Sequence, residues 1–300
     1  MMVIDDCILE KEIEKGKFST IYLSRKKNNI EKYATKKYER KLIEKNNYIK
    51  YVKNSITAAN FFNHPNIIKI KDLKKTQKSI YVIYEYCNGG NLSHILEKYQ
   101  QKYINPFPPI IIQHFMRQIV QAFIYIHKFN LIHRNIKLKN FFVNFDTEQD
   151  KENLNLIKAT IKVSGFKHCI KSSKELLKQD IFNVNKCPSQ EKDIFDLGLI
   201  CYIMIFGKNA SYYNDMEVFI NDIEKGKIVC PLPLSKEMLS FLKCMLRNNS
   251  TKRLKIEELY NHEFLRNDIR SFKPINPIKN NFNPLISTTN GYTFSNNIYI

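Results

Sequence analysis

A turn and a strand near the N-terminus carry side chains suited to holding a nucleotide. Residues 15–22 read Lys-Gly-Lys-Phe-Ser-Thr-Ile-Tyr, a strand–turn–strand pattern in which Gly16 lets backbone N–H groups approach phosphates. One strand later, Ala34 is small enough to pack on a purine and Lys36 is long enough to reach its phosphates. With a single glycine in the turn, an ordinary hairpin and a solvated lysine remain the simpler interpretations of each pattern alone. Together they indicate a phosphate-binding site.

The most specific pattern lies at residues 133–140, which read His-Arg-Asn-Ile-Lys-Leu-Lys-Asn and precede a short apolar run. It resembles the catalytic loop H-R-D-L-x-x-x-N of the protein kinase superfamily, with Asn135 where that motif has Asp. Further segments match the family in the same order over about residues 8–265. These are Lys36 as the strand-three lysine, 64–68 (His-Pro-Asn-Ile-Ile), the hinge 84–92, 193–198, 245–254 and 262–265.

The resemblance implies ATP as the cofactor and assigns a role to individual residues. Tyr84 takes the gatekeeper position, and Asn91 stands where a ribose contact usually lies. Ile21, Ala34 and Phe142 would enclose the adenine. The complete set of expected nucleotide-binding residues is Gly16, Ile21, Ala34, Lys36, Tyr84, Glu85, Cys87, Asn91 and Phe142, and the catalytic positions are Asn135, Lys137 and Asn140.

Two departures from the family pattern remove the groups that perform phosphoryl transfer. Asn135 replaces the Asp that orients the substrate hydroxyl and accepts its proton, and an amide is not a base. Residues 163–167 read Val-Ser-Gly-Phe-Lys, so Gly165 stands in place of the metal-binding Asp of D-F-G. Asn140 is at most a weak ligand, because Mg²⁺ favours charged oxygen donors. We therefore expect no metal site.

Two further departures affect the supporting ion pairs. Counting back from His64, the helix position that should carry Glu opposite Lys36 holds Ser55. Cys187-Pro188-Ser189 stands where A-P-E is expected, which leaves Arg253 without its usual Glu. His133, Phe166 and Asp193 remain, however, at positions that stack or anchor the stack in the family. The fold is thus expected to be intact while the chemistry is impaired.

The leading hypothesis is a pseudokinase that acts by binding a protein partner, as a scaffold or allosteric component. One alternative is an atypical active Ser/Thr kinase that keeps Lys36, Lys137 and Asn140. Another is a structural subunit of a larger assembly. Because the expected carboxylates are replaced while Lys36, Lys137, Lys139 and Lys167 remain near the cleft, we predict that any ATP binding is weak and independent of Mg²⁺.

The elements that position these residues follow from residue patterning. β-type runs at 20–24, 33–38, 67–71 and 80–86 and one helix at 47–62 predict a small β-rich N-lobe over residues 1–86. Apolar residues at i, i+3, i+4 and i+7 after Pro109 predict a long helix, and further helical patterns predict a larger helical C-lobe over 87–266. The fold class is α+β, the bilobal protein kinase fold. Residues 267–300 are polar and are expected to form a disordered tail.

Composition excludes several classes of protein. The balance of 48 basic against 29 acidic side chains gives a net charge of +19, but the lysines are scattered, so a basic surface is favoured over a nucleic-acid patch. The longest apolar run, 197–206, is too short to span a bilayer, and the charged N-terminus does not resemble a signal peptide. Seven widely spaced cysteines indicate reduced thiols, so we expect a cytoplasmic protein.

Overall fold

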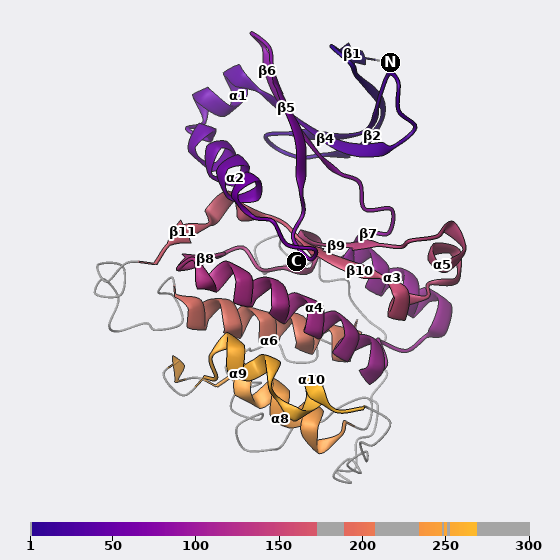
Figure 1. The fold of residues 1–300 in the computed structure, drawn as a ribbon, viewed down its shortest axis with the longest axis vertical. Coiled ribbons are helices and arrows are strands. Elements are labelled where there is room, and N and C mark those ends of the chain that lie inside the picture. The colour runs from indigo at the N-terminus through magenta and orange to yellow at the C-terminus, as the bar shows by residue number, and fades with distance from the viewer. Residues whose placement is uncertain (1, 173–188, 208–233, 248, 251–252, 269–300) are drawn as a thin grey trace, which may run out of the picture.

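The computed structural model describes residues 2–172, 189–207, 234–247, 249–250 and 253–268. It consists of a sheet-rich lobe and a helical lobe, which the chain connects through the segment after strand β6 (Figure 1). This order, with the smaller β-rich lobe first, confirms the expected α+β architecture.

The N-lobe is built on a six-stranded antiparallel sheet with the order β1-β2-β3-β4-β6-β5. Its strands are β1 (Met2–Ile4), β2 (Cys7–Lys15), β3 (Thr20–Lys26), β4 (Lys32–Glu39), β5 (Ile70–Lys75) and β6 (Ser79–Glu85). The predictions at 20–24 and 33–38 are confirmed as parts of β3 and β4, and the prediction at 80–86 is confirmed as β6, which ends one residue earlier. Strands β1 and β2 were not predicted, because only Cys7 and Leu9 of β2 are buried and its remaining residues lack an apolar alternation.

The strand expected at 67–71 was placed too early. The N–H of Ile68 donates to the carbonyl of Val163 in the C-lobe at 2.9 Å, and β5 begins only at Ile70. Ile67 and Ile68 are both buried, so their apolar pattern reports contact between the lobes rather than membership of the N-lobe sheet.

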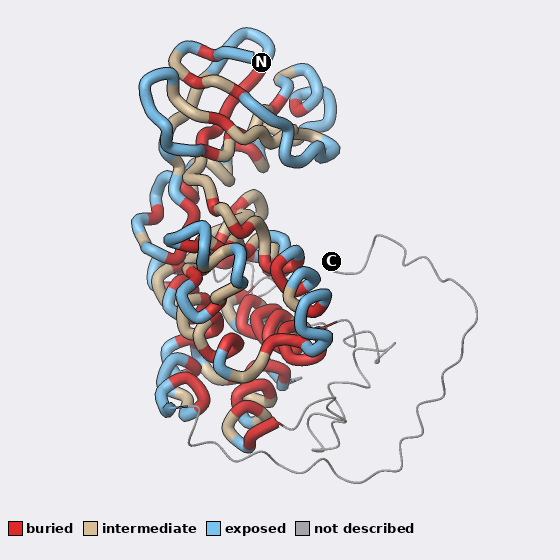
Figure 2. Tube along the Cα trace, turned by 90° about the vertical axis from the view of Figure 1, so that its right-hand side faces the viewer, coloured by how far each residue is buried: buried red, intermediate tan, exposed pale blue. Residues whose placement is uncertain are grey.

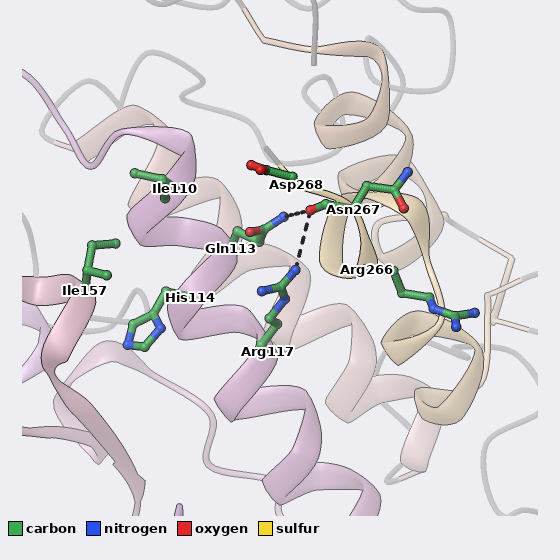
Figure 3. Close-up of a pocket in the computed structure, with 8 residues that line it drawn as sticks. All are labelled: Ile110, Gln113, His114, Arg117, Ile157, Arg266, Asn267 and Asp268. Atoms are coloured by element: carbon green, nitrogen blue, oxygen red, sulfur yellow. Dashed lines mark hydrogen bonds between the residues drawn. The ribbon is translucent and has the colours of Figure 1, made fainter. Parts of the chain in front are cut away.

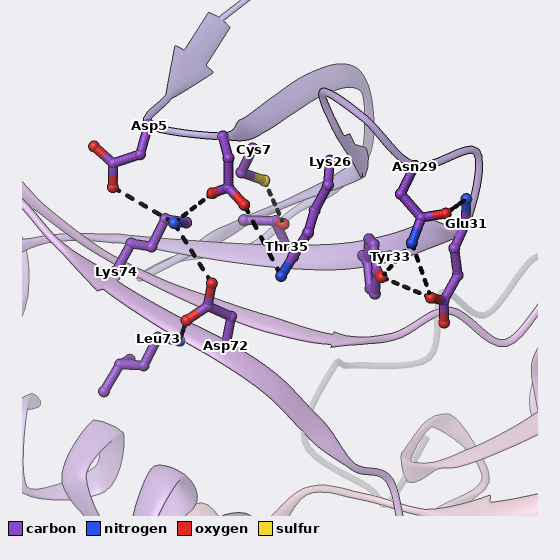
Figure 4. Close-up of polar contacts among 11 residues, drawn as sticks. Asp5, Cys7, Lys26, Asn29, Glu31, Tyr33, Thr35, Asp72, Leu73 and Lys74 are labelled. Carbon is purple, nitrogen blue, oxygen red and sulfur yellow. Dashed lines mark hydrogen bonds and ion pairs between the residues drawn. The ribbon is translucent and has the colours of Figure 1, made fainter.

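The β1–β2 hairpin is fastened to strand β5 by Lys74 (Figure 4). Its ammonium lies 2.6 Å from Asp6, 3.5 Å from Asp5 and 3.5 Å from Asp72. The hydrogen bond from Lys74 holds the pKa of the Asp6 carboxyl below its usual value. These contacts connect opposite edges of the sheet and lie outside the candidate site.

Helix α1 (Arg40–Lys45) and helix α2 (Ile49–Phe61) follow strand β4. The helix predicted at 47–62 is confirmed as α2. The buried Val52 on α2 packs in a cluster with residues of β4 and β6, including Tyr38 and Val82. This packing places the central residues of α2 next to the face of the sheet that carries Lys36.

The C-lobe core is formed by helices around α4 and α6, where buried residues concentrate (Figure 2). Pro109 occupies the first turn of α4, where its missing N–H is no loss. A Cβ at Gly198 of α6 would lie 2.8 Å from the side chain of Leu246, so glycine permits close packing there. The helices are α3 (Leu92–Tyr103), α4 (Pro109–Lys128), α6 (Gln190–Phe206), α8 (Lys236–Met245), α9 (Ile256–Tyr260) and α10 (Glu263–Arg266).

Short elements on the N-lobe side of α4 carry the segments that match the catalytic motifs. Strands β7 (Gly90–Asn91), β9 (Phe141–Asn144) and β10 (Thr160–Val163) form one small sheet, and β8 (Leu131–Ile132) pairs with β11 (Ile170–Lys171). Helix α5 (Glu148–Asn153) and three 3₁₀ turns, η1 (Leu138–Asn140), η2 (Leu156–Lys158) and η3 (Phe166–His168), complete this region.

Several expectations fall partly or wholly outside the described residues. The tail is described only as far as Asp268, and Cys187, Pro188 and Cys230 are not described. The five cysteines that are described carry free thiols. Over the described ranges, no helix combines the length and apolar character needed to span a membrane.

Candidate functional site

The loop 133–140 is fixed to helix α6 by a buried carboxylate. Asp193, in the first turn of α6, accepts the backbone N–H of His133 at 2.8 Å and that of Arg134 at 3.0 Å. Its Oδ2 also lies 3.0 Å from Nε2 of His127. These three contacts satisfy a carboxylate that is 1% exposed, so they set the position of the loop backbone.

Aromatic rings connect this loop to helix α2. The ring of His133 meets that of Phe166 at a centroid distance of 5.0 Å, as the sequence predicted, and Phe166 meets Phe62 at 5.1 Å. Nε2 of His133 lies 2.9 Å from the carbonyl of Ser164, and burial lowers the pKa of this imidazole. The rings pack edge-on or tilted, and such arrangements stabilise aromatic pairs beyond the burial of their surface.

At position 135, the side-chain amide is used as a structural donor. Nδ2 of Asn135 donates to the carbonyl of Gly165 at 2.8 Å, and the carbonyl of Asn135 accepts from Nδ2 of Asn140 at 2.6 Å. A carboxylate at 135 has no proton to donate to that carbonyl. The substitution therefore removes a base and adds a hydrogen bond between the loop and the Gly165 segment.

The side chain of Asn140 occupies the space next to Gly165. Gly165 has φ +90°, and a Cβ built on it would lie 2.5 Å from both Cγ and Nδ2 of Asn140. The backbone N–H of Ser164 also donates to the carbonyl of Asn140 at 2.8 Å. With Asn140 in this position, any side chain at residue 165 would collide with it, and the φ angle independently favours glycine.

Lys36 on β4 faces aromatic and hydroxyl groups at the position where an acidic partner is absent. Its ammonium lies 5.5 Å from the ring centroid of Tyr38. Burial raises the pKa of the Tyr84 phenol on the neighbouring strand β6 to about 12, so this group stays neutral. The groups that approach Lys36 at this position are therefore neutral phenols.

Three lysines gather around this site. Burial lowers the pKa of Lys167 in η3, and the charges of Lys137 and Lys36 lower it further. Over the part of the chain that the structure describes, none of these three ammonium groups lies in an ion pair. Lys139, by contrast, is exposed to solvent. Among the described residues, the charge of this site is therefore positive.

Comparison with known proteins accounts for this arrangement. A family model described as the protein kinase domain matches residues 8–265. The chain belongs to the protein kinase family. Protein kinase domains bind ATP between their two lobes, and the sequence motifs around Lys36 and residues 133–140 occupy the corresponding region of this fold.

Curated relatives are similar to this kinase domain at low identity. CBL-interacting serine/threonine-protein kinase 12 of Arabidopsis thaliana is 22% identical over 86% of the chain and 52% of its own length. Serine/threonine-protein kinase ATG1c of the same organism is 24% identical over 88% of the chain and 36% of its own length. An Aurora kinase of Candida glabrata is 25% identical over 87% of the chain and 71% of its own length. The chain thus spans about half or less of the first two relatives.

The metal ions of kinase catalysis do not fit the residues of this domain. At three positions near the phosphate site where the family carries acidic residues, this chain has Ser55, Asn135 and Gly165. The side chain of Asn140 occupies the space beside Gly165. Among the described residues, no group of three or more His, Cys, Asp or Glu side chains could hold a metal ion. The three nearby ammonium groups would also repel a divalent cation.

The hinge residues have partners within the domain. The carboxylate of Glu85 accepts the N–H of Lys69 at 2.8 Å and lies 3.1 Å from Nζ of Lys162. Asn91 caps helix α3 by accepting the N–H of His94 at 3.0 Å, which competes with the expected ribose contact. Cys87 is buried, and burial raises the pKa of its thiol to about 12.

Two of the three residues expected to enclose the adenine lie on neighbouring strands of the N-lobe sheet, and the third lies in the small C-lobe sheet. Ile21 on β3 pairs in register with Lys36, and Ala34 on β4 pairs with Tyr84 on β6. Phe142 on β9 pairs with Asn91 on β7, and its side chain is partly buried. Gly16 lies in a tight turn, where its N–H donates to the carbonyl of Ser19 at 2.8 Å.

Arg253 finds other partners in place of the missing Glu. It donates to the carbonyl of Glu191 at 3.0 Å and to that of Arg247 at 2.8 Å, and its guanidinium lies 4.9 Å from the ring centroid of Phe195. Ser189, which replaces the Glu, accepts the N–H of Lys192 at 3.1 Å and caps α6. These contacts hold the Arg253 side chain in place although position 189 carries Ser instead of Glu.

A series of aromatic contacts that joins the turn after Gly16, helix α2 and η3 was not predicted. The ring of Phe18, in the turn after Gly16, stacks on Tyr48 at 4.2 Å, Tyr48 meets Tyr51 at 5.2 Å, and Tyr51 meets His168 at 5.1 Å. The spacing of Tyr48 and Tyr51 at i, i+3 was the available signal. These contacts hold the turn against α2 and α2 against η3.

Proposed function

We propose that this protein is a pseudokinase, a protein kinase domain that does not catalyse phosphoryl transfer and acts by binding a protein partner as a scaffold or allosteric component. The observation that carries the proposal is the contact between Asn140 and Gly165, which fills the metal-binding corner with a neutral amide. Phosphoryl transfer depends on positioning and on stabilising charge at the phosphates, and both rely on the metal-binding carboxylate.

The preserved frame supports a binding role. The anchors at Asp193, the rings of His133 and Phe166, and the compensated Arg253 all stabilise the fold without contributing acid–base chemistry. A domain that keeps its frame while losing its reacting groups presents a rigid surface, and rigid surfaces bind with little ordering cost.

We further propose that ATP binds weakly and without Mg²⁺. Lys36, Lys137 and Lys167 supply positive charge where the metal ions would otherwise neutralise the phosphates. This binding is expected to weaken with salt, because the partly exposed ammonium groups are screened by counterions.

A second candidate function is an atypical active Ser/Thr kinase. The observation in its favour is that Lys36, Lys137 and Asn140 are retained, and that Lys36 and Lys137 lie close enough to Lys167 to shift its pKa. This candidate requires a replacement for the carboxylates at 135 and 165.

Transfer of labelled phosphate from ATP separates the two functions. The full chain is incubated with Mg²⁺ or Mn²⁺ and generic Ser/Thr substrates, and incorporation into substrate and into the chain itself is measured. We expect no incorporation above that of a Lys36→Ala variant. Incorporation that disappears in Lys36→Ala would overturn the pseudokinase proposal and establish the active kinase.

A thermal-shift titration with ATP tests the nucleotide proposal. The shift is expected to be of similar size in excess Mg²⁺ and in EDTA, to fall in Lys36→Ala and Lys167→Ala, and to persist in the matched control Lys139→Ala. A shift seen only with Mg²⁺ would refute the role of the lysines. No shift in either buffer would refute nucleotide binding and leave the binding role to the protein surface.

A further inference from the structure

A groove on the C-lobe, formed largely by helix α4, lies beside the point where the described chain ends (Figure 3). It has a volume of about 500 Å³, within the range of ~300–1,000 Å³ typical of binding sites. Ile110 is 43% exposed and Ile157 is 42% exposed, so two branched apolar side chains line it without being covered. Its remaining lining residues are Gln113, His114, Arg117, Arg266, Asn267 and Asp268.

Helix α4 fixes the direction in which the chain leaves α10. Nε2 of Gln113 donates to the carbonyl of Asn267 at 3.0 Å, and a guanidinium N–H of Arg117 donates to the carbonyl of Leu265. Asp268, the last described residue, itself lines the groove. The described chain therefore ends at the edge of the groove.

The sequence of those residues has a period of three. Ile269, Phe272, Ile275 and Ile278 recur at i, i+3, i+6 and i+9, with prolines at 274 and 277 between them. A polyproline II helix has three residues per turn, so these four apolar side chains would share one face. The two prolines have φ near the polyproline II value, and each residue before a proline is also biased toward it.

We propose that residues 269–278 dock back into this groove as a polyproline II segment, with the apolar face covering Ile110 and Ile157. The proposal concerns only this part of the polar tail, and it holds whether or not the protein transfers phosphate. The groove would thus bind a segment of its own chain rather than a small molecule or a second protein.

The distances and the tether favour this occupant. A polyproline II segment rises about 3.1 Å per residue, so its apolar side chains repeat every ~9 Å along the groove and begin directly after Asp268. A short tether gives an effective concentration of roughly millimolar, so even a docking affinity of that order keeps the segment bound about half of the time. The prolines lower the entropy lost on docking.

The polar rim of the groove matches the backbone of such a segment. A polyproline II helix makes no internal hydrogen bonds, so its carbonyls need outside donors. Arg117 has five N–H donors, and its described contacts with Leu265 and Asn267 use two of them. The exposed guanidinium of Arg266 lies on the opposite side of the groove from Ile157 (Figure 3).

Limited proteolysis of the full chain tests the proposal. Trypsin can cut after Arg270, which lies between Ile269 and Phe272, and after Lys279, which follows Ile278, whereas the bond between Lys273 and Pro274 resists cleavage. A triple variant, Phe272→Ser with Ile275→Ser and Ile278→Ser, should be cut after Arg270 about twofold faster, since cleavage tracks the undocked population and docking holds the wild-type segment about half of the time. The matched control places Ser at Phe282, Leu285 and Ile286 and should be cut at the wild-type rate.

A reciprocal variant in the groove separates docking from an effect on the tail itself. Ile110→Asp with Ile157→Asp should accelerate the same cleavage while the thermal midpoint of the folded domain stays near that of wild type. Amide exchange at 156–159 should also become faster in the triple tail variant. Equal cleavage in the wild type, the triple variant and the groove variant would overturn the proposal, because residues 269–278 would then be undocked in all three.

Discussion

Two regions of this kinase domain differ in how far they depart from the family. We call the buried contacts around Asp193, His133 and Phe166 the back, and the positions that face phosphate and metal in the family the front. At the back, Asp193 holds the catalytic loop, and His133 packs on Phe166 as expected for an intact fold. At the front, the positions that handle phosphate and metal carry Ser55, Asn135 and Gly165. The fold can therefore persist without the catalytic side chains of the family. Its stability comes from buried contacts in which those side chains take no part.

The largest loss of stability is expected from a substitution in the buried aromatic stack at the back of the domain. Phe166→Ala removes a ring that is 1% exposed and contacts both His133 and Phe62, so we expect a loss of about 3–5 kcal/mol in the free energy of unfolding. Urea denaturation measures it. The control Phe61→Ala, at a residue 55% exposed, should cost less than about 1 kcal/mol. Equal costs would show that the ring stack does not carry the frame.

The next largest effect tests whether the side chain of Asn140 fills the space beside Gly165. Gly165→Asp should destabilise the protein by about 2–3 kcal/mol, through the φ angle of +90° and the collision with Asn140. In an Asn140→Ala background the collision is absent, and only about 1 kcal/mol should remain. A double-mutant cycle in urea gives the coupling. If the cost is the same in both backgrounds, Asn140 does not occupy the corner.

A pH dependence within the frame is expected to be of similar or smaller size. Burial raises the pKa of Asp196 on α6 to about 6, against an unfolded value near 3.8. The folded state therefore holds this proton more tightly, and stability should fall by about 1–3 kcal/mol as pH rises from ~4 to ~6. Asp196→Asn should flatten this fall, whereas Asp146→Asn at an exposed site should not. An unchanged pH profile in Asp196→Asn would contradict the assignment.

The smallest effect concerns the turn at the front. Phe18→Ala removes the stacking on Tyr48 at 4.2 Å, and we expect a loss of about 1 kcal/mol together with faster amide exchange in the turn 16–19. Lys17→Ala, one residue away and exposed, should leave both nearly unchanged. Should exchange in the turn be equally fast in all three proteins, the turn is not held by its aromatic ring.

Several features of the fold and the site were predictable because they depend on local patterns. The period of α4 identifies a helix with one buried face, and the run 133–140 identifies the loop by residue type and spacing. The first two strands escaped prediction because β2 exposes most of its residues, so no apolar alternation marks it. The sequence predicts that Arg253 lacks its usual Glu at position 189, whereas no residue pattern reveals the backbone carbonyls to which it donates.

The sequence by itself determined the kinase family and the positions where this chain departs from the family motifs, because motif residues keep their order and spacing along the chain. Only the tertiary structure decided what fills the vacated places. Asn140 lies over Gly165, and Phe18 stacks on Tyr48. Each pair joins segments distant in the chain, and close packing selects a neighbour by shape and volume rather than by its place in the sequence.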